Sequence, residues 1–198
     1  MAKKALILPS LLGLPLLAQL NSDWPQWGGA ARNFLATAGG PAFAATWPAT
    51  GPVKVWSRPL GSGHAQVAVA GGVLFTTYRT GSTEFVLAAD AATGQTRWEH
   101  KYEASFQSEA GDYGHGPYAT PLMVRNRVFT AGSTGILHCL DKNSGKVLWS
   151  QDLWGQHGGT RLVYGYASSP LAFRDTIILP VGGKGTALAL FSLSRAVD

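Results

Sequence analysis

Hydrophobic and polar positions alternate along this chain in short stretches, and turns rich in glycine, asparagine and aspartate separate them. A period of two is typical of half-buried β-strands, and helix-periodic segments with caps are hard to find after the first twenty residues. The same sequence of stretches returns at a spacing of about 50 residues. The pattern therefore predicts an all-β protein made of repeats of four short antiparallel strands.

The expected strands fall into three repeats, at about 61–103, 115–153 and 164–198. They cover 66–70, 73–78, 84–89 and 95–101, then 118–124, 127–130, 136–140 and 146–152, then 166–173, 176–181 and 186–191. Residues 21–60 form a Trp-rich leading segment that we expect to be extended. Within it, Val53, Val55 and Trp56 alternate with polar residues, which predicts one more strand at 51–60 and makes Trp56 the packing tryptophan of an incomplete repeat.

An eleven-residue motif occurs at Ala88–Trp98 and again at Cys139–Trp149, with the copies 51 residues apart. Each copy has a small residue, then an aspartate, then Thr-Gly or Ser-Gly, then tryptophan. The ten positions are Ala88, Asp90, Thr93, Gly94, Trp98, Cys139, Asp141, Ser144, Gly145 and Trp149. The aspartate is expected to accept backbone N–H groups in a turn, and the glycine to take a positive φ. The tryptophan is expected to pack on the neighbouring repeat, so these residues are predicted to be structural.

A second phrase supports the repeat. Ala119-Thr120-Pro121-Leu122 returns 49 residues later as Ser168-Ser169-Pro170-Leu171. In the third copy of the motif, Phe191 is expected at the aspartate position and Arg195 at the glycine position, and the tryptophan would fall one residue past the end. The expectation is a truncated N-terminal portion with about three blades of a propeller, which normally has about four to eight.

The beginning of the chain has the composition of an export signal. Lys3 and Lys4 precede an apolar run from Ala5 to Leu20, so residues 1–20 are expected to be a signal peptide, or alternatively a retained apolar anchor. Pro9 and Pro15 argue against a stable transmembrane span. The expected location is therefore periplasmic or extracellular.

Charge and cysteine content exclude other classes. The formal net charge of +5 falls to about +3 without Lys3 and Lys4, and no basic run with interleaved aromatics predicts a nucleic-acid partner. Cys139 is the single cysteine, so no intrachain disulfide forms, and we expect a small buried side chain in preference to a reactive thiol.

Histidines supply the candidate ligand residues. His64 and His115 lie 51 residues apart, and we expect them at equivalent places before a first strand. They could line a ligand- or metal-binding ring at the channel, or hydrogen-bond a neighbouring turn. Glu109 and Asp112 are possible acid and base partners of His115, although no nucleophile accompanies them.

Two further stretches carry weaker signals. His157, with Arg161 and Tyr164, could form an anion site or remain ordinary loop residues. The glycine-rich stretch 182–186 lacks the spacing of a phosphate-binding loop, and a tight hairpin is the expectation.

The motif at Ala88–Trp98 resembles the tryptophan-docking motif of the quinoprotein, or PQQ-like, β-propellers. The stretch Asp23–Gly28 resembles the opening phrase of exported PQQ-binding-like repeat proteins. The resemblance implies a partial β-propeller of about three four-stranded antiparallel blades. It does not imply one activity, because the fold also serves non-enzymatic scaffolds of outer-membrane assembly.

Quinoprotein dehydrogenases hold their quinone between a tryptophan and a vicinal disulfide, beside a calcium ion, and this chain's single cysteine cannot supply that disulfide. The expected function is a non-catalytic, exported scaffold that binds other proteins, the remaining blades or a ligand, with no catalytic or metal residues. The alternative is a fragment of a PQQ-dependent dehydrogenase of alcohols or sugars, with PQQ and calcium as cofactors and an incomplete active site.

Overall fold

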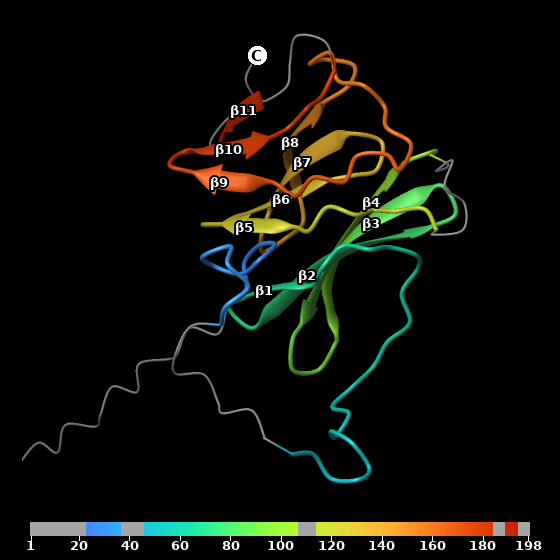
Figure 1. Ribbon diagram of the computed structural model, residues 1–198, viewed down its shortest axis with the longest axis vertical. Coiled ribbons are helices and arrows are strands. Elements are labelled where there is room, and N and C mark those ends of the chain that lie inside the picture. Colours follow the sequence, from blue (N-terminus) through green and yellow to red (C-terminus); the bar gives the residue numbers. More distant parts are fainter. Residues whose placement is uncertain (1–22, 37–45, 107–113, 184–188, 194–198) are drawn as a thin grey trace, which may run out of the picture.

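The computed structural model describes residues 23–36, 46–106, 114–183 and 189–193, and these residues are organised in three antiparallel sheets without a helix (Figure 1). The first sheet contains β1 (Ala68–Ala70), β2 (Val73–Thr80), β3 (Thr83–Asp90) and β4 (Thr96–Glu103). The second contains β5 (Leu122–Val124), β6 (Arg127–Ala131), β7 (Ile136–Asp141) and β8 (Val147–Asp152). The third contains β9 (Leu171–Phe173), β10 (Thr176–Leu179) and β11 (Ala189–Ser192). Consecutive strands pair in every sheet, as in the blades of a propeller.

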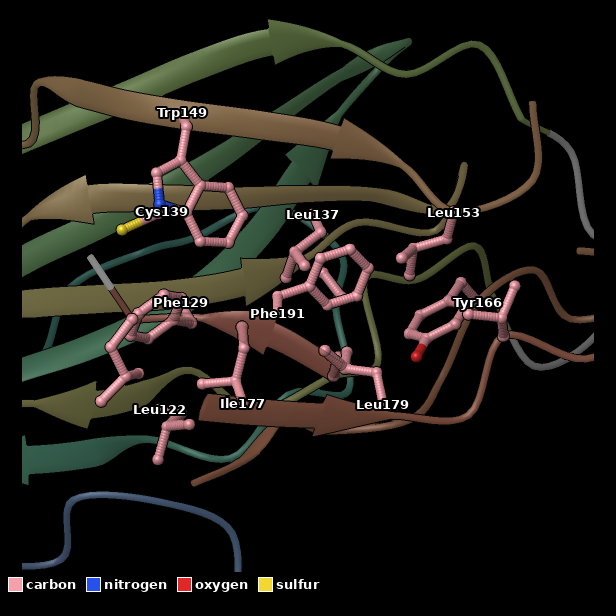
Figure 2. Close-up of a cluster of buried hydrophobic side chains, with 14 residues drawn as sticks. Leu122, Phe129, Leu137, Cys139, Trp149, Leu153, Tyr166, Ile177, Leu179 and Phe191 are labelled. Atoms are coloured by element: carbon pink, nitrogen blue, oxygen red, sulfur yellow. The ribbon is translucent and has the colours of Figure 1, made fainter. Parts of the chain in front are cut away.

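The sheets pack face to face through two apolar clusters. Phe75 and Trp98 of the first sheet meet Met123, Val128 and Leu140 of the second. The second interface joins the second and third sheets, and Figure 2 shows Phe129, Cys139 and Trp149 on one side with Ile177 and Phe191 on the other. The second sheet is therefore covered on both faces. This arrangement confirms the predicted all-β fold and makes the chain a partial β-propeller, with a third sheet of three strands in its described part.

The first hairpin of each sheet turns through two residues, and these turns define which positions are equivalent. Ala70 pairs with Val73, Val124 with Arg127, and Phe173 with Thr176. The turn residues include Gly71 and Gly72 at φ +61° and +73°, and Arg125 and Arg174 at φ +54° and +53°. Positive φ at such positions matches the twist of the flanking strands.

The strand predicted at 51–60 is wrong. The structure contains no strand there, and the side chains of Val53 and Val55 are 89% and 78% exposed. No backbone hydrogen bond pairs this stretch with a described strand, so alternation alone does not produce a strand. Trp56 nevertheless packs against the first sheet, as described below.

The register predicted for the third repeat is also off by one residue. Ser192 pairs with Thr176 as Asp141 pairs with Arg127, so Ser192, not Phe191, occupies the aspartate position. Thr176 and its partner Ser192 are 16 positions apart, whereas Arg127 and its partner Asp141 are 14 apart, and the sequence comparison did not place these two extra residues. A one-residue slip reverses the face, and Phe191 is accordingly buried against the second sheet. Ser194 and Arg195 lie outside the described residues.

Candidate functional site

The two copies of the eleven-residue motif form the same turn. Asp90 Oδ1 accepts the backbone N–H groups of Ala92 and Thr93 and the hydroxyl of Thr93, at 3.1, 3.0 and 3.1 Å. Asp141 Oδ1 accepts the equivalent groups of Asn143 and Ser144, at 3.1, 2.9 and 2.8 Å. The Arg97 guanidinium lowers the pKa of Asp90, and the Ser144 hydroxyl lowers that of Asp141. Both carboxylates therefore stabilise the turns of the motif.

Two tryptophans lie on the glycines of these turns. A Cβ atom on Gly94 would be 2.8 Å from the Trp56 ring, and one on Gly145 would be 2.5 Å from the Trp98 ring. The indole N–H of Trp56 donates to Ala91 O at 3.1 Å, and that of Trp98 to Lys142 O at 2.8 Å. Each indole thus contacts the same part of the next turn along the chain. The indole nitrogen of Trp149 is buried and has no hydrogen-bond partner in the described part of the chain.

A pocket of about 500 Å³ opens where the three sheets meet the N-terminal segment. The segments that precede β1, β5 and β9, here called the leads (residues 64–67, 118–121 and 167–170), supply most of its wall. Its lining comprises His64, Gln66, Tyr118, Thr120, Ala167, Ser168 and Ser169 from the leads, Leu171 and Ile178 from the third sheet, Pro180 directly after β10, and Trp27 and Arg32. The volume suits a small molecule. No lining residue is an aspartate or a glutamate.

Equivalent residues of the three leads are joined by hydrogen bonds across the pocket wall. Gln66, Thr120 and Ser169 each lie two residues before their strand. The backbone N–H of Gln66 donates to Thr120 Oγ1 at 3.2 Å, and the backbone N–H of Thr120 donates to Ser169 Oγ at 2.9 Å. A hydroxyl that accepts an N–H group keeps its own hydrogen for donation. The pocket wall therefore presents two hydroxyl donors that have no acceptor among the described residues.

Arg32 closes one side of the pocket. Its Nη1 donates to Pro170 O at 3.3 Å and to Gln26 Oε1 at 3.4 Å, and its guanidinium carbon lies 5.6 Å from the centre of the Trp27 ring. Its backbone has φ +54°, an uncommon conformation for a side-chain-bearing residue. The N-terminal segment is anchored to the first two sheets: Trp24 N donates to Val69 O at 2.8 Å, and Pro25 O accepts from Met123 N at 2.8 Å.

His64 is the one histidine of the pocket lining. Its ring stacks on Tyr118 with centroids 5.0 Å apart and planes at 7°. The predicted equivalence of His64 and His115 is wrong, because His64 lies four residues before β1 whereas His115 lies seven before β5. The β2–β3 hairpin spans 17 positions from Val73 to Asp90, whereas the β6–β7 hairpin spans 14 from Arg127 to Asp141, and this difference shifts the spacing. The residue equivalent to His64 is Tyr118, which lies four residues before β5. Glu109 and Asp112 lie outside the described residues.

The residues of the predicted anion site at 157–164 have separate partners. His157 Nε2 lies 3.0 Å from Gln151 Oε1, and its ring meets Phe191 edge-on at 5.2 Å. The guanidinium of Arg161 lies 4.7 Å over the ring of Phe106. No hydrogen bond or ring contact among the described residues joins His157, Arg161 and Tyr164. Within 182–186, Gly182 and Gly183 have positive φ, and the remaining residues are outside the described part.

A buried carboxylate, which the sequence did not single out, joins the first and second sheets. Glu84 is fully buried and accepts the backbone N–H of Ser133 at 3.1 Å, the hydroxyl of Ser133, and the hydroxyl of Tyr102 at 2.7 Å. Burial, together with the charge and hydrogen bond of Glu84, raises the pKa of Tyr102. The sequence feature that could have identified this site is a single glutamate within an otherwise apolar strand, because a buried charge needs hydrogen-bond partners.

Four polar side-chain atoms at the same interface are buried without a hydrogen-bond partner. They are Thr77 Oγ1 and His100 Nε2 of the first sheet, and Thr130 Oγ1 and His138 Nδ1 of the second. The two imidazole rings are 5.2 Å apart. Desolvation lowers the pKa of His100, and it lowers the pKa of His138 to about 4, helped by repulsion from His100. Both imidazoles are therefore neutral at pH 7.

The described residues do not fit a quinone site with calcium. Calcium prefers several carboxylate and carbonyl oxygens, whereas the pocket wall has no carboxylate. Groups of three or more His, Cys, Asp or Glu side chains with metal-binding geometry are absent from the described part. Cys139 is buried in the apolar cluster, which raises the pKa of its thiol to about 11. In the same part of the chain, no helix has the length and hydropathy needed to cross a membrane.

Three meandering sheets stacked in chain order define a PQQ-like β-propeller segment. The family model described as "Outer membrane protein assembly factor BamB" matches residues 31–192, and the chain belongs to this family. No curated protein sequence matches the chain.

Solved structures similar to the chain include quinohemoprotein alcohol dehydrogenase from Comamonas testosteroni, with 20% identity and a TM-score of 0.48 over 67% of this chain and 20% of that one. BamB from Moraxella catarrhalis has 23% identity and a TM-score of 0.40 over 64% of this chain and 32% of that one. A europium-containing methanol dehydrogenase has 17% identity and a TM-score of 0.48 over 70% and 24%. The chain thus spans between a fifth and a third of these proteins' lengths.

Proposed function

We propose that this chain is a non-catalytic PQQ-like propeller segment that binds a small ligand in the pocket formed by its leads. The observation that carries the proposal is the convergence of three equivalent leads, joined by hydrogen bonds, on one pocket. Aromatic rings and hydroxyl donors line it, and none of its serine hydroxyls is hydrogen-bonded to His64. A wall of this kind binds and orients, but it lacks the paired nucleophile and base that catalysis by side chains requires.

The eleven-residue motifs serve as joints between blades in this proposal. Trp56, Trp98 and Trp149 each extend from one repeat toward the next. Ala88 and Cys139, both fully buried, pair with Trp98 and Trp149 across the strand. These joints hold the leads in register, so the pocket depends on them although they lie outside it. The partners of such a scaffold are further blades or other proteins.

Export is part of the same proposal. Residues 1–20 have signal-peptide composition, and the family is described by a factor of outer-membrane assembly. We therefore propose a location in the periplasm or outside the cell. Cell fractionation of the full chain tests this, and finding it in the cytosol with residues 1–20 intact would contradict it.

The binding role is tested by titrating the ¹⁵N-labelled full chain with benzamide, a small neutral aromatic amide. Binding in the pocket should shift the amide signals of Gln66, Thr120 and Ser169, and Trp27→Ala should weaken binding by removing a ring of the wall. Trp47→Ala is the matched control, because Trp47 is 65% exposed and does not line the pocket. Amide spectra that stay unchanged with benzamide, benzoate and phenyl phosphate would overturn the proposal.

The dehydrogenase alternative is tested separately. The full chain with PQQ, calcium and a primary alcohol should not reduce a redox dye above the level of PQQ alone. Protein-dependent dye reduction would show that the non-catalytic assignment is wrong.

A further inference from the structure

We propose that the ligand of this pocket carries an oxyanion, a carboxylate or a phosphate, which Arg32 binds together with the hydroxyls of Thr120 and Ser169. This inference rests on the proposed binding function and names the chemistry of the ligand. It follows from the hydrogen-bonding capacity of the wall, counted donor by donor.

Arg32 has guanidinium N–H donors and a positive charge that no described residue pairs with. The two protein acceptors it reaches are neutral oxygens, both contacted by Nη1 at 3.3 and 3.4 Å, and its other nitrogens have no acceptor among the described residues. The ion pairs of that part of the chain join Arg97 to Asp90 and Arg125 to Asp175, and neither involves Arg32. A partly buried guanidinium without a carboxylate partner favours an anion, which its planar fork can bind through two oxygens.

The leads supply further hydrogen-bond donors to the same pocket. Thr120 is buried and Ser169 half-buried, and each hydroxyl oxygen already accepts a backbone N–H. Their hydroxyl hydrogens therefore point to whatever acceptor enters the pocket. A neutral polyol would gain most from charged acceptors, and the lining contains no carboxylate. An oxyanion accepts only, so it matches this wall better.

The flat surfaces of the pocket define the rest of the ligand. Trp27 and the stacked pair His64–Tyr118 present rings to the cavity. A volume of about 500 Å³ leaves room for a body beyond the oxyanion. The class is thus a small, oxyanion-bearing molecule with a planar apolar part.

The test is a set of matched probes titrated into the full chain by NMR: benzoate, phenyl phosphate and neutral benzamide. Benzoate or phenyl phosphate should bind at least tenfold more tightly than benzamide, and the tighter of the two anions identifies the headgroup. Equal binding of benzamide and both anions would overturn the oxyanion while leaving the ligand-binding proposal intact. Binding of none of the three would overturn both.

A matched pair of variants isolates the guanidinium. Arg32→Gln should weaken anion binding at least tenfold and leave benzamide binding within twofold, and Arg32→Lys should restore only part of it, because a point charge lacks the fork. Arg174→Gln is the control, since Arg174 has nearly the same φ of +53° and lies 5.3 Å over Phe173 but outside the pocket. Equal losses in both variants, or no loss in Arg32→Gln with its fold verified by its amide spectrum, would contradict the role of Arg32.

Discussion

Trp98 of the first sheet lies directly on Gly145 of the second, so that a Cβ atom on Gly145 would be 2.5 Å from ring atom Cε3. Gly145 also has φ +71°, a conformation that other residues adopt at a cost. Both effects oppose a side chain at this position. The contact couples two residues that are 47 positions apart in the chain and belong to different sheets.

Gly145→Ala is therefore expected to destabilise the protein by about 2–4 kcal/mol, from overpacking added to the left-handed backbone penalty. The measurement is urea unfolding followed by circular dichroism. Gly71→Ala is the control, because Gly71 has φ +61° but nothing within 4 Å of its would-be Cβ, and it should cost only about 1 kcal/mol. Equal costs for the two variants would show that the Trp98 contact contributes nothing.

Removing the ring itself gives a second prediction. Trp98 is 9% exposed and packs with Phe75 at a centroid distance of 5.9 Å. Trp98→Ala should cost about 3–5 kcal/mol, through lost burial and a cavity between the sheets. Trp47→Ala, at a ring that is 65% exposed, should cost less than about 0.5 kcal/mol in the same urea titration. A loss below about 1 kcal/mol for Trp98→Ala would contradict a structural role.

The buried histidines predict a pH dependence. The pKa of His138 is about 4 in the folded protein and near 6.5 when unfolded, so the unfolded chain takes up the extra proton between these values. The free energy of unfolding should therefore fall as the pH decreases from 7 to 4, by on the order of 3 kcal/mol, and His100 adds in the same direction.

Urea unfolding at pH 7, pH 5 and pH 4 measures this loss. The neighbouring titratable groups are Tyr102, whose ring lies 4.4 Å from that of His138, and Glu84, which accepts the Tyr102 hydroxyl. The carboxylates with lowered pKa, Asp90 and Asp141, act at lower pH. His138→Phe should remove most of the slope, whereas His64→Phe, at an exposed ring, should keep it. A slope that persists unchanged in His138→Phe would refute the assignment.

The thiol of Cys139 offers a fourth check. Its pKa of about 11 and its complete burial leave little thiolate at pH 8 and no access to it. Ellman's reagent should react with the native protein at least about a hundredfold more slowly than with the chain in urea. A native thiol that reacts at the rate of free cysteine would be inconsistent with the buried position.

The sequence predicted the repeat and most strands because the Asp–Gly–Trp turn is a local feature whose hydrogen bonds close within six residues. It failed where a decision depended on distant partners. The alternation at Val53 and Val55 looked like a strand, but a strand needs a neighbour. The one-residue register error at Phe191 arose because the loops between equivalent strands differ in length. Such a difference cannot be recognised from a single copy of the motif that departs from the pattern of the other two.

The residues of the pocket likewise divide into those that a local pattern predicted and those whose position depends on distant contacts. The repeated phrase contained Thr120 and Ser169, yet their joint function depends on a bond from the N–H of one lead to the hydroxyl of the next. Arg32 and Trp27 are held at the pocket by contacts distant in sequence, in which Trp24 pairs with Val69 and Pro25 accepts from Met123. The sequence singled out His64, which lines the pocket, but paired it with His115, whereas its equivalent is Tyr118. Glu84 was missed because its partners Ser133 and Tyr102 lie far from it in sequence.

The hydrogen bonds that run from Gln66 to Thr120 and on to Ser169 all point in one rotational sense around the pocket. A hydroxyl that donates to a ligand becomes a better acceptor for the N–H behind it, because such bonds polarise one another. We therefore expect the proposed ligand binding and the cohesion of the sheets to be thermodynamically linked. A bound oxyanion should tighten the blades, and a mutation that loosens a distant tryptophan joint should lower ligand affinity without touching the pocket.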